Sequence, residues 1–399
     1  MSKDKVFTGS KTIKQNTKMK ITNYIYALIM LGIFVCCGKN NETTSFETIT
    51  LKNEYIDLSK CLDFEFVPLE TTKDNLIGII SNIKMTEDRI FIFDSYKANA
   101  LFVFDKKGKY ITRIGSPGMG PGEFAHLAGF DIDVINNNII IYDFKRKFMY
   151  YDLNTYKLIT EKSMDISCCD FIILPQDEYA FFHTNGFECL GKNKNNFVLI
   201  TDTLFNPKKA YYKAEFTTPI ISRNSSSNFY KLNNSYYMYN HLLPYVYKIT
   251  DKTFEPTYQL SLDSYRFPTI DFLKRETKGK SDYTKLIDKH DFISSYGLYE
   301  TKDFLWIPFH KGNMPPCTGF YDKKEKKGYI LSLVDYFKSI GLGVLPFAKG
   351  NTDEYIICEI KFDEDQKAKI NKNKILKEAI ENKSSDDNPI LCLIKAKQE

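Results

Sequence analysis

Short apolar segments separated by polar turns run along most of the chain and recur in a fixed order. Residues 89–114 form an apolar strand, a polar turn, a second strand, a Lys-rich turn and a third strand. The same order returns in residues 138–163 and 235–262. One more apolar strand precedes these units, as in residues 79–85 and 128–135. The pattern therefore predicts repeated units of four short strands.

An aspartate closes a strand at the same place in successive units. It recurs as Asp105, Asp152, Asp202 and Asp251, at intervals of 47, 50 and 49 residues. Four short strands repeating at this length are typical of a propeller blade. A single blade cannot bury both of its faces, so the blades must stack around a common axis.

The last two units carry charged insertions. Residues 267–290 lengthen the fifth unit and residues 363–383 interrupt the sixth, and both stretches predict helices. The sixth unit offers only three strands at residues 343–349, 354–362 and 388–395, while an unmatched strand at residues 64–70 precedes the first unit. We expect this N-terminal strand to complete blade 6 and remove a sheet edge.

The predicted fold is thus all-β: a six-bladed β-propeller of four-stranded antiparallel blades. Its ring is closed by an N-terminal strand, and short helical insertions lie in blades 5 and 6.

An apolar run of eleven residues at 25–35 (IYALIMLGIFV) follows Lys18 and Lys20 near the N-terminus. It is too short to span a bilayer comfortably but suits the apolar region of a signal peptide. With the cysteines that follow, it resembles a bacterial lipoprotein signal, which implies lipid attachment at Cys37, with Cys36 as the neighbouring alternative. An ordinary cleaved signal peptide or a buried hydrophobic segment would also fit the run.

These features divide the chain into four parts. Residues 1–18 fit no part of a signal peptide and are interpreted as an annotation extension. Residues 19–36 are the predicted lipoprotein signal peptide, residues 37–50 the lipid anchor with a polar tether, and residues 51–399 the propeller. This organisation predicts export and anchoring in the cell envelope, on the periplasmic or outer-membrane face.

Composition narrows the possible partners and cofactors. The net charge of +5 is small and spread along the chain, so we predict no nucleic-acid partner. The cysteines beyond the leader are irregularly spaced and form no CxxC pair, which favours buried free thiols over a zinc site.

Three further segments are distinctive: residues 57–84 (DLSKCLDFEFVPLETTKDNLIGIISNIK), 115–124 (GSPGMGPGEF) and 386–397 (DDNPILCLIKAK). They resemble segments of the six-bladed β-propeller lipoproteins of Bacteroides and its relatives. The resemblance covers residues 46–397 and implies the same fold. More distantly, the blades are similar to NHL-repeat and TolB-like propellers, which serve mainly as binding platforms.

Polar residues end the second strand of five blades and predict a polar ring on one face of the disc. This candidate ligand-binding face comprises Asp94, Asp143, His183, Asn240 and His310, together with Arg113, Glu123 and His126 near the glycine-rich loop. The alternative is structural, because Asp and Asn at strand ends commonly cap the following turn. Asp131 and Asp133, on the innermost strand of blade 2, could likewise border the channel or a metal, or be solvated or capping carboxylates.

We weigh three functions. The first is a cell-envelope binding module for a glycan, a peptide or an envelope protein, held to the membrane by its N-terminal lipid. The second is a metal-dependent propeller enzyme, lactonase-like or lyase-like, with acidic and His residues around a divalent cation at the channel mouth. The third is a structural scaffold. No catalytic motif is visible, so binding or scaffolding is preferred and no catalytic residue is assigned.

Overall fold

The structure is a computed structural model that describes residues 46–398, apart from 166, 188–194, 217–226, 251, 278–286, 288, 313 and 371–373. The predicted signal peptide, Cys36, Cys37 and Asp251 lie outside the described residues. Among the described helices, none is long and apolar enough to cross a membrane.

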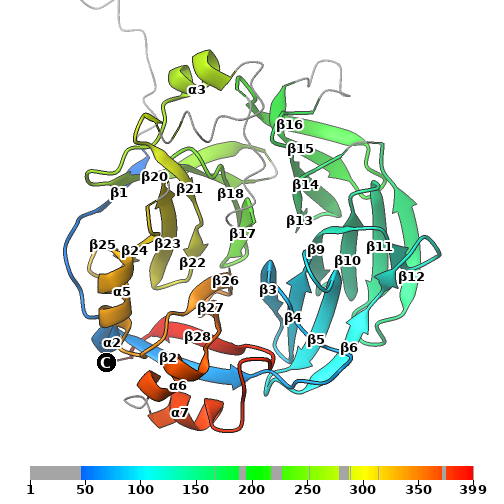
Figure 1. The fold of residues 1–399 in the computed structure, drawn as a ribbon. Helices are drawn as coiled ribbons and strands as arrows, with labels where there is room; N and C mark the ends of the chain where they lie inside the picture. Colours follow the sequence, from blue (N-terminus) through cyan, green and yellow to red (C-terminus); the bar gives the residue numbers. More distant parts are fainter. Residues whose placement is uncertain are drawn as a thin grey trace, which may run out of the picture. The chain divides into compact units, whose positions relative to one another are not determined.

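Six antiparallel sheets are arranged around a central axis, as Figure 1 shows. Blades 1 to 3 follow one another along the chain, each with its first strand innermost. Blade 1 consists of β3 (Asn82–Met85), β4 (Arg89–Asp94), β5 (Ala100–Asp105) and β6 (Tyr110–Ile114). Blade 2 consists of β9 (Leu127–Asp133), β10 (Asn138–Asp143), β11 (Lys147–Asp152) and β12 (Leu158–Ser163). Blade 3 consists of β13 (Asp170–Leu174), β14 (Glu178–Phe182), β15 (Asn196–Asp202) and β16 (Pro207–Lys213).

Blades 4 to 6 keep this order with additions. Blade 4 contains β17 (Phe229–Leu232), β18 (Ser235–Tyr239), β19 (Tyr245–Ile249) and β20 (Phe254–Leu262). Blade 5 contains β21 (Ile293–Tyr296), β22 (Tyr299–Glu300), β23 (Phe304–Lys311), β24 (Cys317–Asp322) and β25 (Lys327–Leu331). Blade 6 contains β26 (Phe347–Asn351), β27 (Ile356–Ile360), β28 (Ile390–Ala396) and β2 (Leu62–Pro68).

The N-terminal strand closes the ring as expected. β2 pairs antiparallel with β28 along its whole length, from Leu62 opposite Ala396 to Pro68 opposite Ile390. The predicted six-bladed fold is therefore confirmed.

The middle strands of the blades are mostly apolar because both of their faces are covered. In β4, Ile90 and Ile92 pack in a cluster shared with blade 6, whereas Phe91 and Phe93 pack in a cluster shared with blade 2. Successive side chains of a strand point to opposite faces, so one continuous apolar run supplies two separate cores. The core of the molecule is thus a series of inter-blade layers.

The recurring aspartates at the ends of the third strands begin the turns to the fourth strands. Asp105 accepts hydrogen bonds from the backbone amides of Lys107 (2.8 Å) and Lys109 (2.9 Å). Asp152 and Asp202 make the same kind of contact with their own turns. The repeat noticed in the sequence is therefore a repeat of turn capping.

Two boundaries differ from the sequence expectation. Residues 47–50, assigned to the tether, belong to β1 (Glu47–Leu51), which pairs parallel with β20 as a fifth strand of blade 4. The strand expected at residues 343–349 is β26, which begins only at Phe347. It is delayed because helix α5 (Leu333–Ile340) and a left-handed turn at Gly341 and Gly343 precede it.

The expected helices form, and a short one accompanies the ring closure. α3 (Ile270–Thr277) lies between β20 and β21, while α6 (Glu364–Lys369) and α7 (Lys374–Ile380) lie between β27 and β28. α2 (Leu58–Cys61) precedes β2. The cysteines described are free; Cys168, Cys358 and Cys392 are buried, and Cys189 lies outside the described residues.

Candidate functional site

Two sets of loops share one side of the ring. Because strands alternate in direction within a blade, the turns after the second strands and the connections between blades emerge together. We call this side the loop face. The predicted ring residues all belong to it, distributed over blades 1 to 5.

Asp94 is fully buried at the end of β4 and binds backbone only. One carboxylate oxygen accepts from the amides of Gly78 (2.7 Å) and Ile79 (3.0 Å), which lead into blade 1. The other accepts from Tyr96 (3.1 Å) and Lys97 (2.9 Å), in the turn that follows. Four donors fill the acceptor capacity of this carboxylate, so it fastens two loops together.

Asp143 repeats this arrangement in blade 2. It is 2% exposed and accepts from the amides of Ala125 (2.8 Å), His126 (3.2 Å) and Lys145 (3.1 Å). Asp94 and Asp143 occupy the same position at the end of the second strand of their blades. Both hold the neighbouring loops by accepting hydrogen bonds from loop amides.

Arg113 and Glu123 also contact local backbone. The Arg113 guanidinium donates to the carbonyls of Ala98 (3.4 Å) and Asn99 (3.3 Å). Glu123 accepts from the amide of Gly120 (2.7 Å) inside the glycine-rich loop, which is pinned by the short parallel pair β7 (Ser116–Pro117) and β8 (Glu123–Phe124). Gly115 has a φ of +67°, and a Cβ there would lie 2.7 Å from the Phe124 ring, so the loop needs glycine at this position.

The remaining ring residues lie in blades 3 to 5. The Nδ1 atom of His183 accepts from the amide of Asn185 (3.2 Å). Asn240 is buried, with its Oδ1 accepting from Leu242 (3.0 Å). His310 lies in β23 opposite Ser295 of the innermost strand.

The loops of blades 1 and 2 expose three large side chains among charged ones such as Lys97 and Lys145. Tyr96, Met119 and Phe144 are 58%, 72% and 52% exposed. The His126 ring stacks on Phe144 with centroids 5.5 Å apart and planes 13° apart, and Lys145 Nζ lies 3.4 Å from the sulfur of Met119. We call Tyr96, Met119, His126 and Phe144 the aromatic patch.

The backbone beneath the aromatic patch is tied across the two blades. Asn99 donates its side-chain amide to the carbonyl of Ala125 (3.4 Å) and accepts from the amide of Leu127 (3.0 Å). Together with the Asp94 and Asp143 anchors, these bonds fix the loops that carry the patch.

Carboxylates on the innermost strands join neighbouring blades. Asp131 of blade 2 forms an ion pair with Lys84 of blade 1 (2.6 Å) and accepts from the amide of Ile173 in blade 3 (2.8 Å). Asp170 of blade 3 accepts from Ser227 and from the amide of Asn228 (2.6 Å), next to blade 4. Burial raises the pKa of Asp170, although these hydrogen bonds oppose the rise. Polar contacts thus link the innermost strands of blades 1 to 3 to one another and to the segment before blade 4. Asp133 instead caps a turn by accepting from the amide of Asn136 (3.0 Å).

His241, which the sequence did not single out, is the histidine with the clearest electrostatic perturbation. It follows β18, its Nδ1 lies 2.9 Å from the carbonyl oxygen of Tyr296, and its ring meets Tyr239 edge-on at 5.1 Å. Burial lowers the pKa of His241 to about 4, and the hydrogen bond to Tyr296 offsets only part of that change. The apolar residues Leu242 and Leu243 after it were a usable signal for an enclosed position.

The blades and their polar inter-blade contacts define the molecule as a six-bladed β-propeller. A family model described as "6-bladed beta-propeller" matches residues 38–359, and the chain belongs to this family. No curated protein matches the chain.

Among solved structures, a Bacteroides fragilis protein described as a "Putative exported protein" is similar, with a TM-score of 0.78 and 22% identity. The match covers 88% of this chain and 100% of that protein, and it supports the fold. The β-propeller domain of Cps50 (Swd1) from Myceliophteria thermophila covers 73% of this chain and 97% of its own, with 6% identity. Its TM-score of 0.41 is too low to carry an argument.

Proposed function

We propose that this chain is an exported, lipid-anchored envelope protein whose propeller binds a protein partner through the aromatic patch of the loop face. Export is supported by the apolar run at residues 25–35 and by the description of the similar Bacteroides fragilis protein. The lipid is proposed to be attached at Cys37, which holds the propeller at a membrane surface in the cell envelope.

The observation that carries the binding role is that the polar and the apolar side chains of the loop face have different surroundings. Its strand-end carboxylates are occupied by loop amides, while Tyr96, Met119 and Phe144 stand in solvent on an anchored backbone. Aromatic and Met side chains on rigid loops are the composition of protein-binding hot spots. Because the backbone is already ordered, little conformational entropy is lost when a partner binds.

A glycan is a weaker candidate for the same patch. Sugar recognition needs several free hydrogen-bonding side chains beside a stacking ring. The carboxylates of Asp94 and Asp143 already accept hydrogen bonds from backbone amides. A metal-dependent enzyme has no supporting observation: among the described residues, no three His, Cys, Asp or Glu side chains gather to hold a metal ion.

A site-specific crosslink in cells tests the binding role. A photoreactive phenylalanine analogue at Phe144 should give an adduct of one defined mass, and Tyr96→Ala should reduce its yield at least fivefold. Placing the analogue at Ile135, which is 90% exposed in a turn on the other side of blade 2, is the matched control and should give none. Equal adducts from both positions, or no adduct from Phe144, would refute the proposed surface.

The anchor has its own test. Cys37→Ser should move the protein from the membrane fraction to the soluble fraction and abolish labelling by a radioactive fatty acid. Cys36→Ser is the control and should leave both properties unchanged. The opposite result would place the lipid on Cys36, and labelling of neither thiol would remove the anchor from the proposal.

A further inference from the structure

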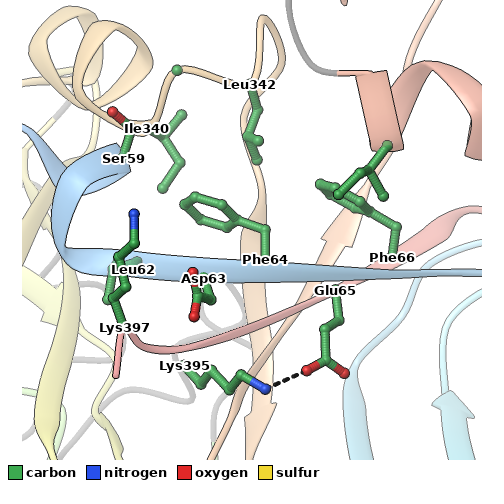
Figure 2. Close-up of a pocket in the computed structure, with 12 residues that line it drawn as sticks. Ser59, Leu62, Asp63, Phe64, Glu65, Phe66, Ile340, Leu342, Lys395 and Lys397 are labelled. Atoms are coloured by element: carbon green, nitrogen blue, oxygen red, sulfur yellow. Dashed lines mark hydrogen bonds and ion pairs between the residues drawn. The ribbon is translucent and has the colours of Figure 1, made fainter. Parts of the chain in front are cut away.

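The outer rim of blade 6, away from the aromatic patch, contains a groove of about 470 Å³. Phe64 and Phe66 of β2 line it together with Leu342 after α5, as Figure 2 shows. Ile375 of α7 also lines it. Ile375 is 61% exposed, although its side chain is apolar. The rim groove therefore offers apolar surface to something outside the blade.

Beside this groove runs the outer edge of β2, which pairs with no further strand of the described residues. β2 is the last strand of its sheet. The amide of Lys397 donates to the carbonyl of Cys61 (2.9 Å), and the amide of Leu69 donates to that of Pro389 (3.3 Å). Hydrogen-bonded pairs alternate along an antiparallel ladder, so the odd-numbered residues of β2 face β28 and the even-numbered ones face outward.

The outward set includes the N–H groups of Phe64 and Phe66. β2 pairs only with β28 among the described strands, and neither N–H donates to any other backbone carbonyl of the described residues. The outward carbonyls of Leu62, Phe64 and Phe66 alternate with them. Pro68 has no N–H and ends the ladder on that side. An extended segment could therefore pair with about five residues of this edge while its alternate side chains enter the rim groove.

Blade 4 shows the same kind of addition inside this molecule. β1 pairs with the outer edge of β20, from Glu47 opposite Tyr258 to Leu51 opposite Leu262. Its alternate side chains Ile49 and Leu51 are 5% and 0% exposed, while Thr48 and Thr50 face solvent. The outer edge of a blade in this fold accepts a fifth strand with branched apolar side chains at alternate positions.

The charged side chains beside the rim groove indicate which charge a segment bound there carries at one end. Lys395 forms an ion pair with Glu65 (2.6 Å), whereas Lys397, which also lines the rim groove, is in no ion pair of the described residues. We propose that the rim groove binds an extended segment of a partner polypeptide by strand addition to β2. That segment carries branched apolar side chains at alternate positions and a carboxylate that meets Lys397.

Fluorescence anisotropy of the full chain with a labelled peptide tests the proposal. The probe has the sequence of residues 46–52 (FETITLK), which offers Glu, Ile and Leu at alternate positions. Ile375→Lys should weaken binding at least tenfold. The matched control is Ile159→Lys, at a 55% exposed position on the outer strand of blade 2, and it should leave binding unchanged.

Backbone chemistry distinguishes strand addition from simple apolar contact. N-methylation of one alternate set of probe amides should abolish binding, and N-methylation of the other set should leave it within about threefold. Hydrogen exchange of residues 62–68 should slow by two amides when the probe binds. No binding at 1 mM, equal effects of the two methylated sets, or insensitivity to Ile375→Lys would overturn the proposal. A dimer of the chain that Ile375→Lys disperses would assign the rim groove to a second copy instead, and would also overturn it.

Discussion

Asp94→Ala is expected to lower the free energy of unfolding by about 3 to 5 kcal/mol, one of the two largest effects predicted for this molecule. The reason is that four backbone N–H groups lose a fully buried charged acceptor at once. Urea unfolding followed by tryptophan fluorescence would measure the change, because the single Trp306 is buried in the core.

Two further variants make the interpretation specific. Asp94→Asn keeps one acceptor oxygen and should lose about half as much stability. Asp105→Ala removes a carboxylate that accepts two amide hydrogen bonds in an outer turn, and should cost about 1 kcal/mol. An unfolding midpoint for Asp94→Ala close to that of the unmodified protein would show that this carboxylate does not hold the loops.

Acidification from pH 6.5 to pH 4 is expected to remove about 2 kcal/mol of stability through His241. Its folded-state pKa of about 4 lies below the ordinary value of 6.5. Between these values the unfolded chain binds a proton that the folded chain excludes, so the stabilisation is complete above pH 6.5 and disappears as the pH falls to 4. The expected loss is smaller than the whole difference between the two pKa values would give, because the His241 ring keeps some contact with solvent.

A pair of histidine variants isolates this contribution. His241→Asn keeps a donor for the Tyr296 carbonyl but does not titrate, so it should flatten the dependence of the melting temperature on pH between 4 and 6.5. His126→Asn changes an exposed histidine of the loop face and should leave the slope intact. A slope that survives His241→Asn would assign the acid sensitivity to other groups.

The fold could be predicted from sequence because each blade repeats a local rule. Strands such as β4 must be apolar on both faces, and a turn aspartate such as Asp105 must follow the third strand, so both leave a periodic trace. The closing strand was predictable for a different reason, since the sixth blade lacked one strand and residues 64–70 had no other partner.

The elements that were missed have no repeat to reveal them. The alternation in ETITL at residues 47–51 is a strand signal, but its partner β20 lies about 200 residues away and so the segment passed for a tether. α5 is short, yet Ser332 caps it by accepting from the amide of Asp335, and Gly341 ends it in a left-handed conformation. These cap residues were a usable signal for this helix.

The strand pattern places Asp94 and Asp143 at the ends of second strands, and therefore on the loop face, but it does not give the direction of their side chains. Whether a carboxylate points to solvent or to nearby amides depends on the conformation of the loops before and after it, and the strand pattern carries no information about that. The exposed aromatic patch therefore became visible only in three dimensions.

The N-terminal segment also sets the order in which the molecule can be completed. β1 joins blade 4, Lys52 exchanges backbone hydrogen bonds with Gly328 and Ile330 of blade 5, and β2 completes blade 6. β2 leaves the ribosome early, but its partner β28 is made near the end of synthesis, since Leu62 pairs with Ala396. Contacts of such long sequence separation form slowly. We expect the pairing of β2 with β28 to be the final folding step. Until then the open ring exposes unpaired strand edges and needs protection from aggregation.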